Sequence, residues 1–366
     1  MQFTCNRDAI LREIIVANEI IYSRNTLSTL SAVLLHADED KLTIRATDIK
    51  VSFETHIPIV SETPGKAAVF CGKFLSILRS LPGGDVFISK EGERVRITDR
   101  GNIEFQLYSI SVDNFPEIPD CEESLYFSLA QKDLVYMIKQ TIFAISADET
   151  RYFMSGIYMN PQEDKLVMVA TDGRRLSHVY SVPGENLPDF PGIIIPPKVL
   201  NLVVKLATGE GAVKLAVVDR LLFIRFDKQK LTSTLIDGQF PNYSRVIPED
   251  QKFNFTVKRS EFNDAIRRVS LLSDQKTKRV FLLLSRGNVV LKSDEREIGK
   301  AEERIKCVYD GPKVVFSVNH SYLTDPLNVI EEEDIALRFT DPFKAITIDS
   351  PDGATFFHIV MPMQKE

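Results

Sequence analysis

The side chains best suited to catalysis or metal binding are scattered along this sequence. Its histidines do not follow H-E-x-x-H or any other metal-ligand spacing. They are His36, His56, His178, His320 and His358. The chain also lacks a P-loop, a G-x-S-x-G nucleophile motif and a G-x-G-x-x-G dinucleotide motif. The sequence therefore predicts no catalytic residues, no metal site and no cofactor.

Three aspartates in similar settings are the remaining acid/base candidates. Asp48, Asp172 and Asp341 lie in TDIK, TDGRR and FTDPF, each after a β-like run. Aspartate in such a position commonly bonds its own backbone and forms a turn. The recurrence favours turn formation, but a hydrolase that uses scattered carboxylates stays an alternative. A clustered acid/base pair with perturbed pKa values in a cleft would support that alternative.

The cysteines and the hydropathy indicate where the chain works. Cys5, Cys71, Cys121 and Cys307 are far apart and include no C-x-x-C pair, so neither a zinc site nor a disulfide framework is expected. The first residues lack the order of a signal peptide, and no apolar run approaches the roughly 18 residues of a membrane span. We expect a cytoplasmic protein without membrane contact.

The charge of the chain argues against a conventional nucleic-acid binder. Its 45 Lys and Arg against 51 Asp and Glu give a net charge of −6, whereas DNA affinity normally comes from neutralising phosphates. Two lysine pairs nevertheless recur at a seven-residue spacing, Lys132 with Lys139 and Lys198 with Lys205, so each pair shares a helix face. These faces are either ordinary solvated surface or weak phosphate-binding surface.

The elements that would carry these residues occur three times, at a period of roughly 120 residues, which is typical of domains. Each repeat opens with a short β-like run and an amphipathic helix: FTCNRDAILREIIVANEII, FSLAQKDLVYMIKQTIFAIS and FTVKRSEFNDAIRRVSLLS. Alternating β-like runs, a second amphipathic helix and further strands follow. The pattern predicts an α+β fold in which two helices pack on antiparallel sheet, with domains 1–121, 122–250 and 251–366.

The third repeat departs from the other two in its charge. Its first helix is surrounded by further basic residues: Lys258, Arg259, Arg267, Arg268, Lys276, Lys278 and Arg279. Its second helix lacks matching basic residues and contains Pro326. That proline predicts either a kink or a late helix start capped by Asp325.

Five segments, in this order and spacing, make the chain resemble the bacterial DNA polymerase III β sliding clamp family along its whole length. They are RYFMSGIYMN (151–160), VATDGRRLS (169–177), DGQFPNYSRVIP (237–248), VNHSYL (318–323) and HIVMPM (358–363). The resemblance implies a non-catalytic processivity factor: two chains joined head to tail in a ring of six clamp domains around duplex DNA. A topological link to DNA would need only weak phosphate contacts, which suits an acidic chain.

The resemblance also implies residues that face DNA. Carried over one by one, they are Arg24, Lys73, Tyr152, Phe153, Lys198 and Lys205. Some family members have arginine directly before the lysines of the second helices, where this chain has Gly72 and Pro197. For Tyr152 and Phe153, packing in a core or loop is the alternative role.

A partner-peptide pocket between the second and third domains is the other implied site. It maps onto Met154, Thr171, Gly173, Arg174, Arg175, Leu176, Pro241, Arg245, Val246, Asn319, Tyr322, Phe343, Ala345, Ile359, Val360, Met361, Pro362 and Met363. The implied partners are the replicative polymerase α subunit, the clamp loader, other polymerases and repair proteins, all through short linear motifs. Met-rich apolar grooves suit such varied ligands. Thr277 and the tail Gln364–Glu366 depart from the family pattern and predict an altered peptide preference.

A homodimer interface is expected where sheet edges would meet. We predict that it uses Phe105 and Leu107 of the first domain with Leu271 and Leu272 of the third. Glu297, Glu302 and Glu303 could complement Arg94, Arg96 or Arg100 there. A protein-only scaffold without a basic DNA-binding surface remains the alternative to a clamp associated with the nucleoid.

Overall fold

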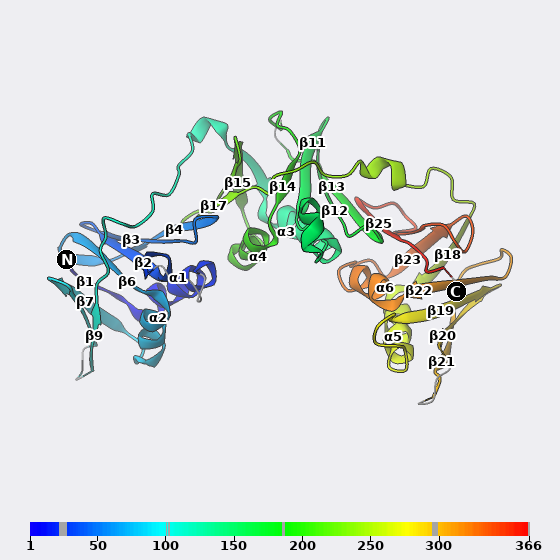
Figure 1. Ribbon diagram of the computed structural model, residues 1–366, viewed down its shortest axis with the longest axis horizontal. Helices are drawn as coiled ribbons and strands as arrows, with labels where there is room; N and C mark the ends of the chain where they lie inside the picture. Colours follow the sequence, from blue (N-terminus) through cyan, green and yellow to red (C-terminus); the bar gives the residue numbers. More distant parts are fainter. Residues whose placement is uncertain (22–27, 100, 102, 185–186, 295–298, 365–366) are drawn as a thin grey trace. The chain divides into compact units, whose positions relative to one another are not determined.

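The computed structural model describes residues 1–366 except 22–27, 100, 102, 185–186, 295–298 and 365–366 (Figure 1). Its described residues form two compact units. Unit 1 consists of Met1–Gln131 and Lys198–Leu235, and unit 2 of Lys132–Pro197 and Ile236–Glu366. The second of the three sequence repeats therefore contributes strands and a helix to each unit.

Unit 1 contains two antiparallel sheets, ordered β5-β1-β7-β8-β9 and β10-β15-β16-β17-β4-β3-β2-β6. Strand β17 of the second repeat pairs with β4 of the first, Leu231 opposite Phe53, so one sheet joins two repeats. The strands are β1 (Gln2–Asn6), β2 (Ala32–Ala37), β3 (Lys41–Thr47), β4 (Val51–Pro58), β5 (Val60–Thr63), β6 (Gly65–Phe70), β7 (Asp85–Glu91), β8 (Arg94–Thr98), β9 (Glu104–Tyr108), β10 (Phe127–Ala130), β15 (Ala212–Val218), β16 (Leu221–Arg225) and β17 (Lys230–Thr234).

Unit 2 repeats this plan with the orders β14-β11-β12-β13-β25-β24-β23-β18 and β21-β20-β19-β22. Here β13 of the second repeat pairs with β25 of the third, Leu176 opposite Ile359. The strands are β11 (Ile157–Gln162), β12 (Lys165–Thr171), β13 (Arg175–Ser181), β14 (Ile193–Ile195), β18 (Phe253–Lys258), β19 (Arg279–Ser285), β20 (Asn288–Ser293), β21 (Glu302–Lys306), β22 (Val314–Asn319), β23 (Asp334–Phe339), β24 (Ile346–Asp349) and β25 (Phe356–Val360).

The helices form where the apolar spacing predicted them. The α-helices are α1 (Arg7–Ile20), α2 (Cys71–Ser80), α3 (Gln131–Thr141), α4 (Pro197–Leu206), α5 (Arg259–Ser270) and α6 (His320–Leu327). Short 3-10 turns are η1 (Ser28–Ser31), η2 (Glu123–Leu125), η3 (Ile142–Ala144), η4 (Glu149–Met154) and η5 (Tyr243–Val246). In α1 the Asn6 side chain caps two backbone amides, and Ile10, Ile14 and Ala17 are buried against α2, β3 and β4. Helices α5 and α6 pack together in the same way in unit 2.

Helix α6 corrects one prediction. It begins after Asn319, whose Oδ1 accepts from the Ser321 amide at 2.9 Å, so the late start capped by Asp325 is wrong. Pro326 lies in the last turn, one residue before the helix ends at Leu327. Because Pro326 has no N–H, the helix forgoes its bond to the Tyr322 carbonyl, a loss confined to the last turn.

Two connecting segments cover a sheet face on the side away from the helices. The first strap (residues 109–126) packs Ile110, Val112 and Phe115 on β2 and β6 in unit 1. The second strap (residues 236–252) packs Phe240 and Tyr243 on β11–β14 in unit 2. Each strap therefore closes a second apolar layer on a sheet whose other layer lies under the helices.

Candidate partner-binding groove and DNA-facing helices

The turn at 171–175 is the local feature on which the candidate site is built. Thr171 Oγ1 donates to the carbonyl of Arg175 at 2.6 Å and accepts from the amide of Gly173 at 3.1 Å. Asp172 Oδ1 accepts from the amides of Arg174 and Arg175 at 2.9 and 3.1 Å. Gly173 has φ = 85°, a left-handed conformation that favours glycine. The sequence element TDGRR thus fixes a tight turn that aims two arginines in different directions.

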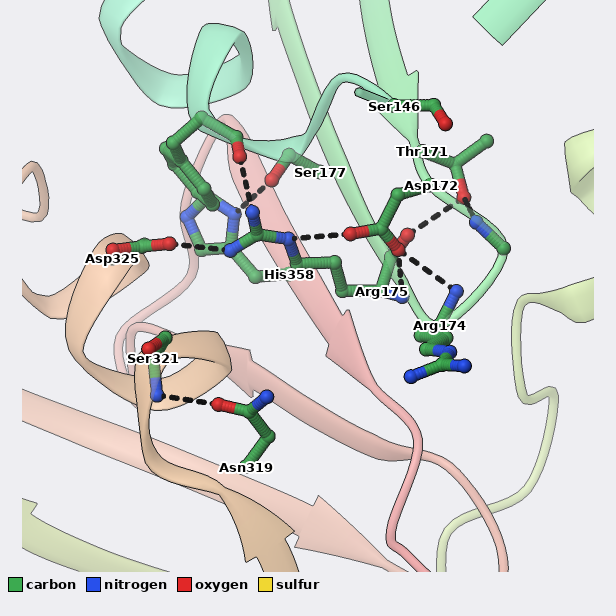
Figure 2. Close-up of polar contacts among 12 residues, drawn as sticks. Ser146, Thr171, Asp172, Arg174, Arg175, Ser177, Asn319, Ser321, Asp325 and His358 are labelled. Carbon is green, nitrogen blue, oxygen red and sulfur yellow. Dashed lines mark hydrogen bonds and ion pairs between the residues drawn. The ribbon is translucent and has the colours of Figure 1, made fainter. Parts of the chain in front are cut away.

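Arg175 holds this turn to the third repeat (Figure 2). Its guanidinium pairs with Asp172 at 3.1 Å and with Asp325 of α6 at 2.5 Å, and also donates to the Phe143 carbonyl at 2.5 Å. The same group lies 4.9 Å from the ring centre of Tyr322 and 5.5 Å from that of Phe143. Only 13% of the side chain is exposed. Arg175 is therefore a brace between two repeats.

A groove of about 440 Å³ opens beside this brace. It is lined by Arg174, Lys276, Thr277, Asn319, Tyr322, Met361, Pro362, Met363 and Gln364. Two backbone bonds hold its tail segment in place, from the Met361 amide to the Arg174 carbonyl at 3.0 Å and from the Met363 amide to the Ser317 carbonyl at 2.6 Å. Because Asn319 Oδ1 is used as the cap of α6, its Nδ2 is the atom left to donate to a ligand.

The predicted pocket residues divide between this groove and its surroundings. Six of them line it: Arg174, Asn319, Tyr322, Met361, Pro362 and Met363. Met154, Thr171, Leu176, Ile359 and Val360 are buried, at 8% exposure or less. Leu176 and Ile359 belong to the apolar cluster under the second strap, with Ala345 packed against it. On and near that strap, Pro241 is half-buried, and Arg245, Val246 and Phe343 are exposed.

Three further residues line the groove: Thr277 and Gln364, which the sequence places at the pocket rim, and Lys276, which is not among the predicted pocket residues. Thr277 had been singled out as a departure from the family pattern, and Lys276 as one of the basic residues near α5. Gln364 belongs to the divergent tail. All three lie in loop or tail segments outside the helices and strands, and only the fold brings them together.

A buried polar cluster lies beneath the brace. His358 is 1% exposed, with Nδ1 3.0 Å from Ser177 Oγ and Nε2 3.1 Å from Gln140 Oε1. Gln140 Nε2 donates to the Val329 carbonyl at 3.0 Å, so Oε1 must accept and His358 must carry its proton on Nε2. Burial lowers the pKa of His358 to about 3. The imidazole is neutral and ties α3, β13, β25 and the segment after α6 together.

The predicted DNA-facing residues lie on several elements. Arg24 falls outside the described residues. Lys73 on α2 is exposed, as are Lys132 and Lys139 on α3. Lys198 on α4 instead pairs with Asp48 at 2.6 Å and donates to the Ile20 carbonyl at 2.6 Å.

Lys205 also pairs within its unit, with Glu19 of α1. In η4, Tyr152 is 53% exposed and Phe153 is half-buried, their rings 5.7 Å apart. Phe153 also packs against the cluster under the second strap. The exposed lysines of α2 and α3, and Lys205 with 58% of its side chain exposed, are thus better placed to meet phosphate than Lys198.

The other chemistry considered from the sequence takes a structural form. Asp48 accepts from the Val51 amide at 2.6 Å, and Asp341 from the Phe343 amide at 2.9 Å, so these aspartates form turns as predicted. Among the described residues, no group of three or more His, Cys, Asp or Glu side chains could hold a metal ion. Within the same residues, no helix is long and apolar enough to cross a membrane.

Three family models match successive parts of the chain. The DNA polymerase III beta subunit N-terminal domain matches residues 1–119, the central domain 128–242 and the C-terminal domain 244–364. The chain is 40% identical over 372 residues to the beta sliding clamp of Treponema pallidum, with 100% of both chains covered. The chain belongs to the DNA polymerase III beta subunit family. It is also 28% identical to the beta sliding clamp of Escherichia coli K12, again over 100% of both chains.

Solved structures of the same family have the same fold. The DNA polymerase sliding clamp from Bacillus subtilis superposes with a TM-score of 0.96 at 26% identity, over 100% of both chains. A sliding clamp from Pseudomonas aeruginosa bound to griselimycin gives a TM-score of 0.95 at 28% identity, with the same coverage. The predicted family, α+β clamp fold and processivity function are confirmed. The chain is a non-catalytic sliding clamp that acts on DNA with a polymerase, and the hydrolase alternative is wrong.

Proposed function

We propose that this clamp recruits its partners through the groove lined by Met361, Met363 and Tyr322. Partners would insert short motifs that carry glutamine and apolar or aromatic anchors. They would include the replicative polymerase α subunit, the clamp loader, other polymerases and repair proteins. The observation that carries the proposal is a groove with an apolar side, formed by Tyr322, Met361, Pro362 and Met363, and a polar side that includes Arg174 and Asn319, next to the Arg175 brace. Flexible methionines let one groove accept several motifs.

A single introduced charge tests the groove. Met361 is 43% exposed, so Met361→Lys should fold normally while placing an ammonium group among the anchors. We expect a fluorescent peptide with Gln followed by Leu and Phe to lose affinity by about tenfold or more, and polymerase stimulation to fall with it. The matched control is Val308→Lys, since Val308 is 77% exposed and outside the groove. Full peptide affinity in Met361→Lys would place the partner site elsewhere.

A tail deletion is a second test, and the fold decides where it begins. Val360 is 1% exposed and pairs with Arg175 and Ile346 inside the sheet. Deleting it would damage β25, so the deletion should begin at Met361 and remove 361–366. The expected result is loss of peptide binding with hydrogen exchange in β25 unchanged.

We further propose a head-to-tail dimer that closes a ring around duplex DNA, with domains 1–121, 122–250 and 251–366. Strands β9 and β21 end their sheets, and among the described strands each has a neighbour on one side only. Phe105 and Leu107 lie on β9, and Leu271 is 81% exposed. Such edges favour pairing with a second chain. Glu303 already pairs with Arg268, so edge pairing and leucines would contribute more than ion pairs between chains.

Retention on DNA tests the ring. Once loaded on nicked circular DNA, the protein should survive a high-salt wash and escape when the circle is linearised, because a topological link does not depend on phosphate contacts. Replacing Leu271 and Leu272 with alanine should give monomers by sedimentation and abolish retention. Equal retention on circular and linear DNA would mean ordinary binding. A clamp that encircles duplex DNA in this way would act at the nucleoid, in the cytoplasm.

A further inference from the structure

The three repeats share one backbone hydrogen bond, which in the first two repeats lies at the start of a strap. The carbonyl of the third residue before each second helix accepts a hydrogen bond from a later backbone amide. The pairs are Ala68 with Ile110 at 2.8 Å, Ile194 with Ile236 at 2.9 Å and Ser317 with Met363 at 2.6 Å. After the first two bonds, a strap continues over the sheet and covers it with aromatic residues. The third bond instead holds a segment whose Met363 and Gln364 line the partner groove.

The strand registers define the face that corresponds to the second strap's footprint. Ile194 lies opposite Tyr158 on β11, and Ser317 lies opposite Phe281 on β19, so Phe281 is the counterpart of Tyr158. Further along, Asn160 pairs with Val167 as Leu283 pairs with Val290.

In the second repeat, two rings of the strap occupy this face. Phe240 stacks on Tyr158 with ring centres 4.8 Å apart. Tyr243 lies 6.2 Å from Tyr158 and accepts from Gln162 Nε2 at 2.8 Å. The position that these rings fill is thus a specific seat for aromatic side chains.

In the third repeat, the corresponding position is a pocket of about 270 Å³. Its floor includes Leu283 and Val290, and its wall Val315, which is 54% exposed. This volume exceeds the roughly 150 Å³ that holds a benzene ring in an apolar cavity. The half-buried Leu283 and the exposed Val315 offer an aromatic anchor an apolar floor and wall inside a polar rim.

The rim of the pocket selects the charge of its occupant. Lys292, Arg304 and Lys313 line it with a single carboxylate, Glu302, which pairs with Lys292 at 2.8 Å. Three cations against one anion favour an acidic segment, although the whole chain has a net charge of −6. The first strap has this chemistry: its SVDNFPEIPD sequence (111–120) combines Phe115 with three carboxylates.

We propose that the outer face of β22-β19-β20-β21 is a second docking surface, separate from the groove, for an extended acidic segment of a partner protein with an aromatic anchor. The segment supplies in trans what the straps supply in cis on the other repeats. It would let a partner hold the clamp at two points, which raises its effective affinity without a tighter groove motif. Edge pairing of β21 with a second chain would leave this face accessible, because the side chains of a strand project from the two faces of the sheet and not from its edge.

The test uses the full chain and a fluorescent peptide of sequence SVDNFPEIPD. We expect saturable binding by anisotropy, which Val315→Glu weakens by about tenfold or more because it adds a carboxylate that repels an acidic ligand. Val308→Glu makes the same change at another exposed valine and should leave binding unchanged. Replacing Phe115 with alanine in the peptide should also abolish binding.

Two further measurements separate the alternatives. Lys313→Glu should weaken the acidic peptide, and a peptide with Glu117→Lys should recover part of that loss, which a folding defect would not produce. Met361→Lys should leave this peptide's affinity unchanged. Loss of binding in Met361→Lys would place the peptide in the groove, and an unaffected Val315→Glu would remove the pocket from the interaction. Assemblies larger than a dimer that Val315→Glu dissolves would identify a second copy as occupant and overturn the proposal.

Discussion

The turns at Thr47–Val51 in unit 1 and Thr171–Arg175 in unit 2 have the same bonds from a threonine hydroxyl to the backbone but different surroundings. In the first, Thr47 Oγ1 donates to the Val51 carbonyl at 3.2 Å and accepts from the Ile49 amide at 3.0 Å, as Thr171 does with Arg175 and Gly173. One short motif, Thr-Asp, therefore builds the same turn in two repeats. The difference between the two units lies in the cation that closes each turn.

In unit 1 the closing cation is Lys198, which arrives from α4 and pairs with Asp48. In unit 2 it is Arg175 of the turn itself, which joins Asp172 to Asp325 on α6. A lysine supplies one point charge, whereas an arginine offers a planar fork that can bond several acceptors and stack on rings. The comparison teaches that the second turn is braced in several directions, and the partner groove is found beside that turn.

The largest expected difference in stability between the units comes from removing the cation that closes each turn. Arg175→Ala leaves Asp172 and Asp325 partly buried without their partner, and we expect unit 2 to lose about 3–5 kcal/mol of stability. Lys198→Ala should cost unit 1 only about 1–2 kcal/mol, because a third of that side chain is exposed and solvent screens the pair. Hydrogen exchange with mass spectrometry reports each unit separately.

Arg175→Lys is the matched control, since it keeps the charge and loses the fork. It should recover less than half of the loss and leave groove peptides bound more weakly. Equal losses for Arg175→Ala and Lys198→Ala would mean that the two turns are braced alike, contrary to the comparison.

The next largest effect should be a loss of stability of unit 2 in acid. His358 in unit 2 is buried and neutral, with a pKa lowered by burial to about 3, while the unfolded chain takes up this proton near pH 6.5. The contribution of neutral His358 to the free energy of unfolding is therefore complete above pH 6.5 and is lost as the pH falls toward 3. At pH 5 the loss is about 2 kcal/mol. Burial also lowers the pKa of His178 in unit 2, to about 4, so the same direction applies twice.

The measurement is urea unfolding at pH 7.5 and pH 5.0, read by exchange in each unit. His358→Gln removes the titration and keeps hydrogen-bonding capacity toward Ser177 and Gln140. It should lower stability at pH 7.5 and reduce the dependence on pH in unit 2 without abolishing it, because His178 still titrates there. If the slope stayed as steep as in the parent protein, His358 would not be its source.

Much of the fold can be predicted from local sequence, because each repeat has apolar residues at helical spacing and short turn motifs. Ile10, Ile14 and the corresponding residues of α3 and α5 keep helical spacing, and the Thr-Asp turns recur. What the sequence could not reveal is that β17 pairs with β4 and β13 with β25, so sheets join successive repeats. Strand pairing at such distance leaves no local signal, since any apolar strand edge would fit.

The candidate site was predictable to the extent that its residues are contiguous in family motifs. Met361, Pro362 and Met363 lie in one run, and so they were found together. Lys276 and Thr277 join them only through the register of β19 against β22. The sequence also could not show that Arg175 is used internally, because its partner Asp325 is 150 residues away.

The smallest expected effect concerns the central residue of the two turns. Ile49 occupies the same left-handed conformation as Gly173, with φ values of 76° and 85°. A β-branched residue is strained there, whereas glycine is not. Ile49 is also 66% exposed, so replacing it sacrifices little apolar packing. We therefore expect Ile49→Asn, which tolerates this conformation without the added chain entropy of glycine, to stabilise unit 1 by about 0.5–1 kcal/mol.

The reciprocal change sharpens the comparison. Gly173→Ala should destabilise unit 2 by about 1 kcal/mol, because it strains the backbone and its Cβ would meet Arg151 Nη1 at 3.0 Å. Arg151 donates to the Asp172 carbonyl at 3.2 Å, so the added methyl group would also loosen the turn from behind. Denaturant midpoints of the two variants should move in opposite directions. A shift in the same direction would show that the turns, despite their shared bonds, do not set the same backbone conformation in solution.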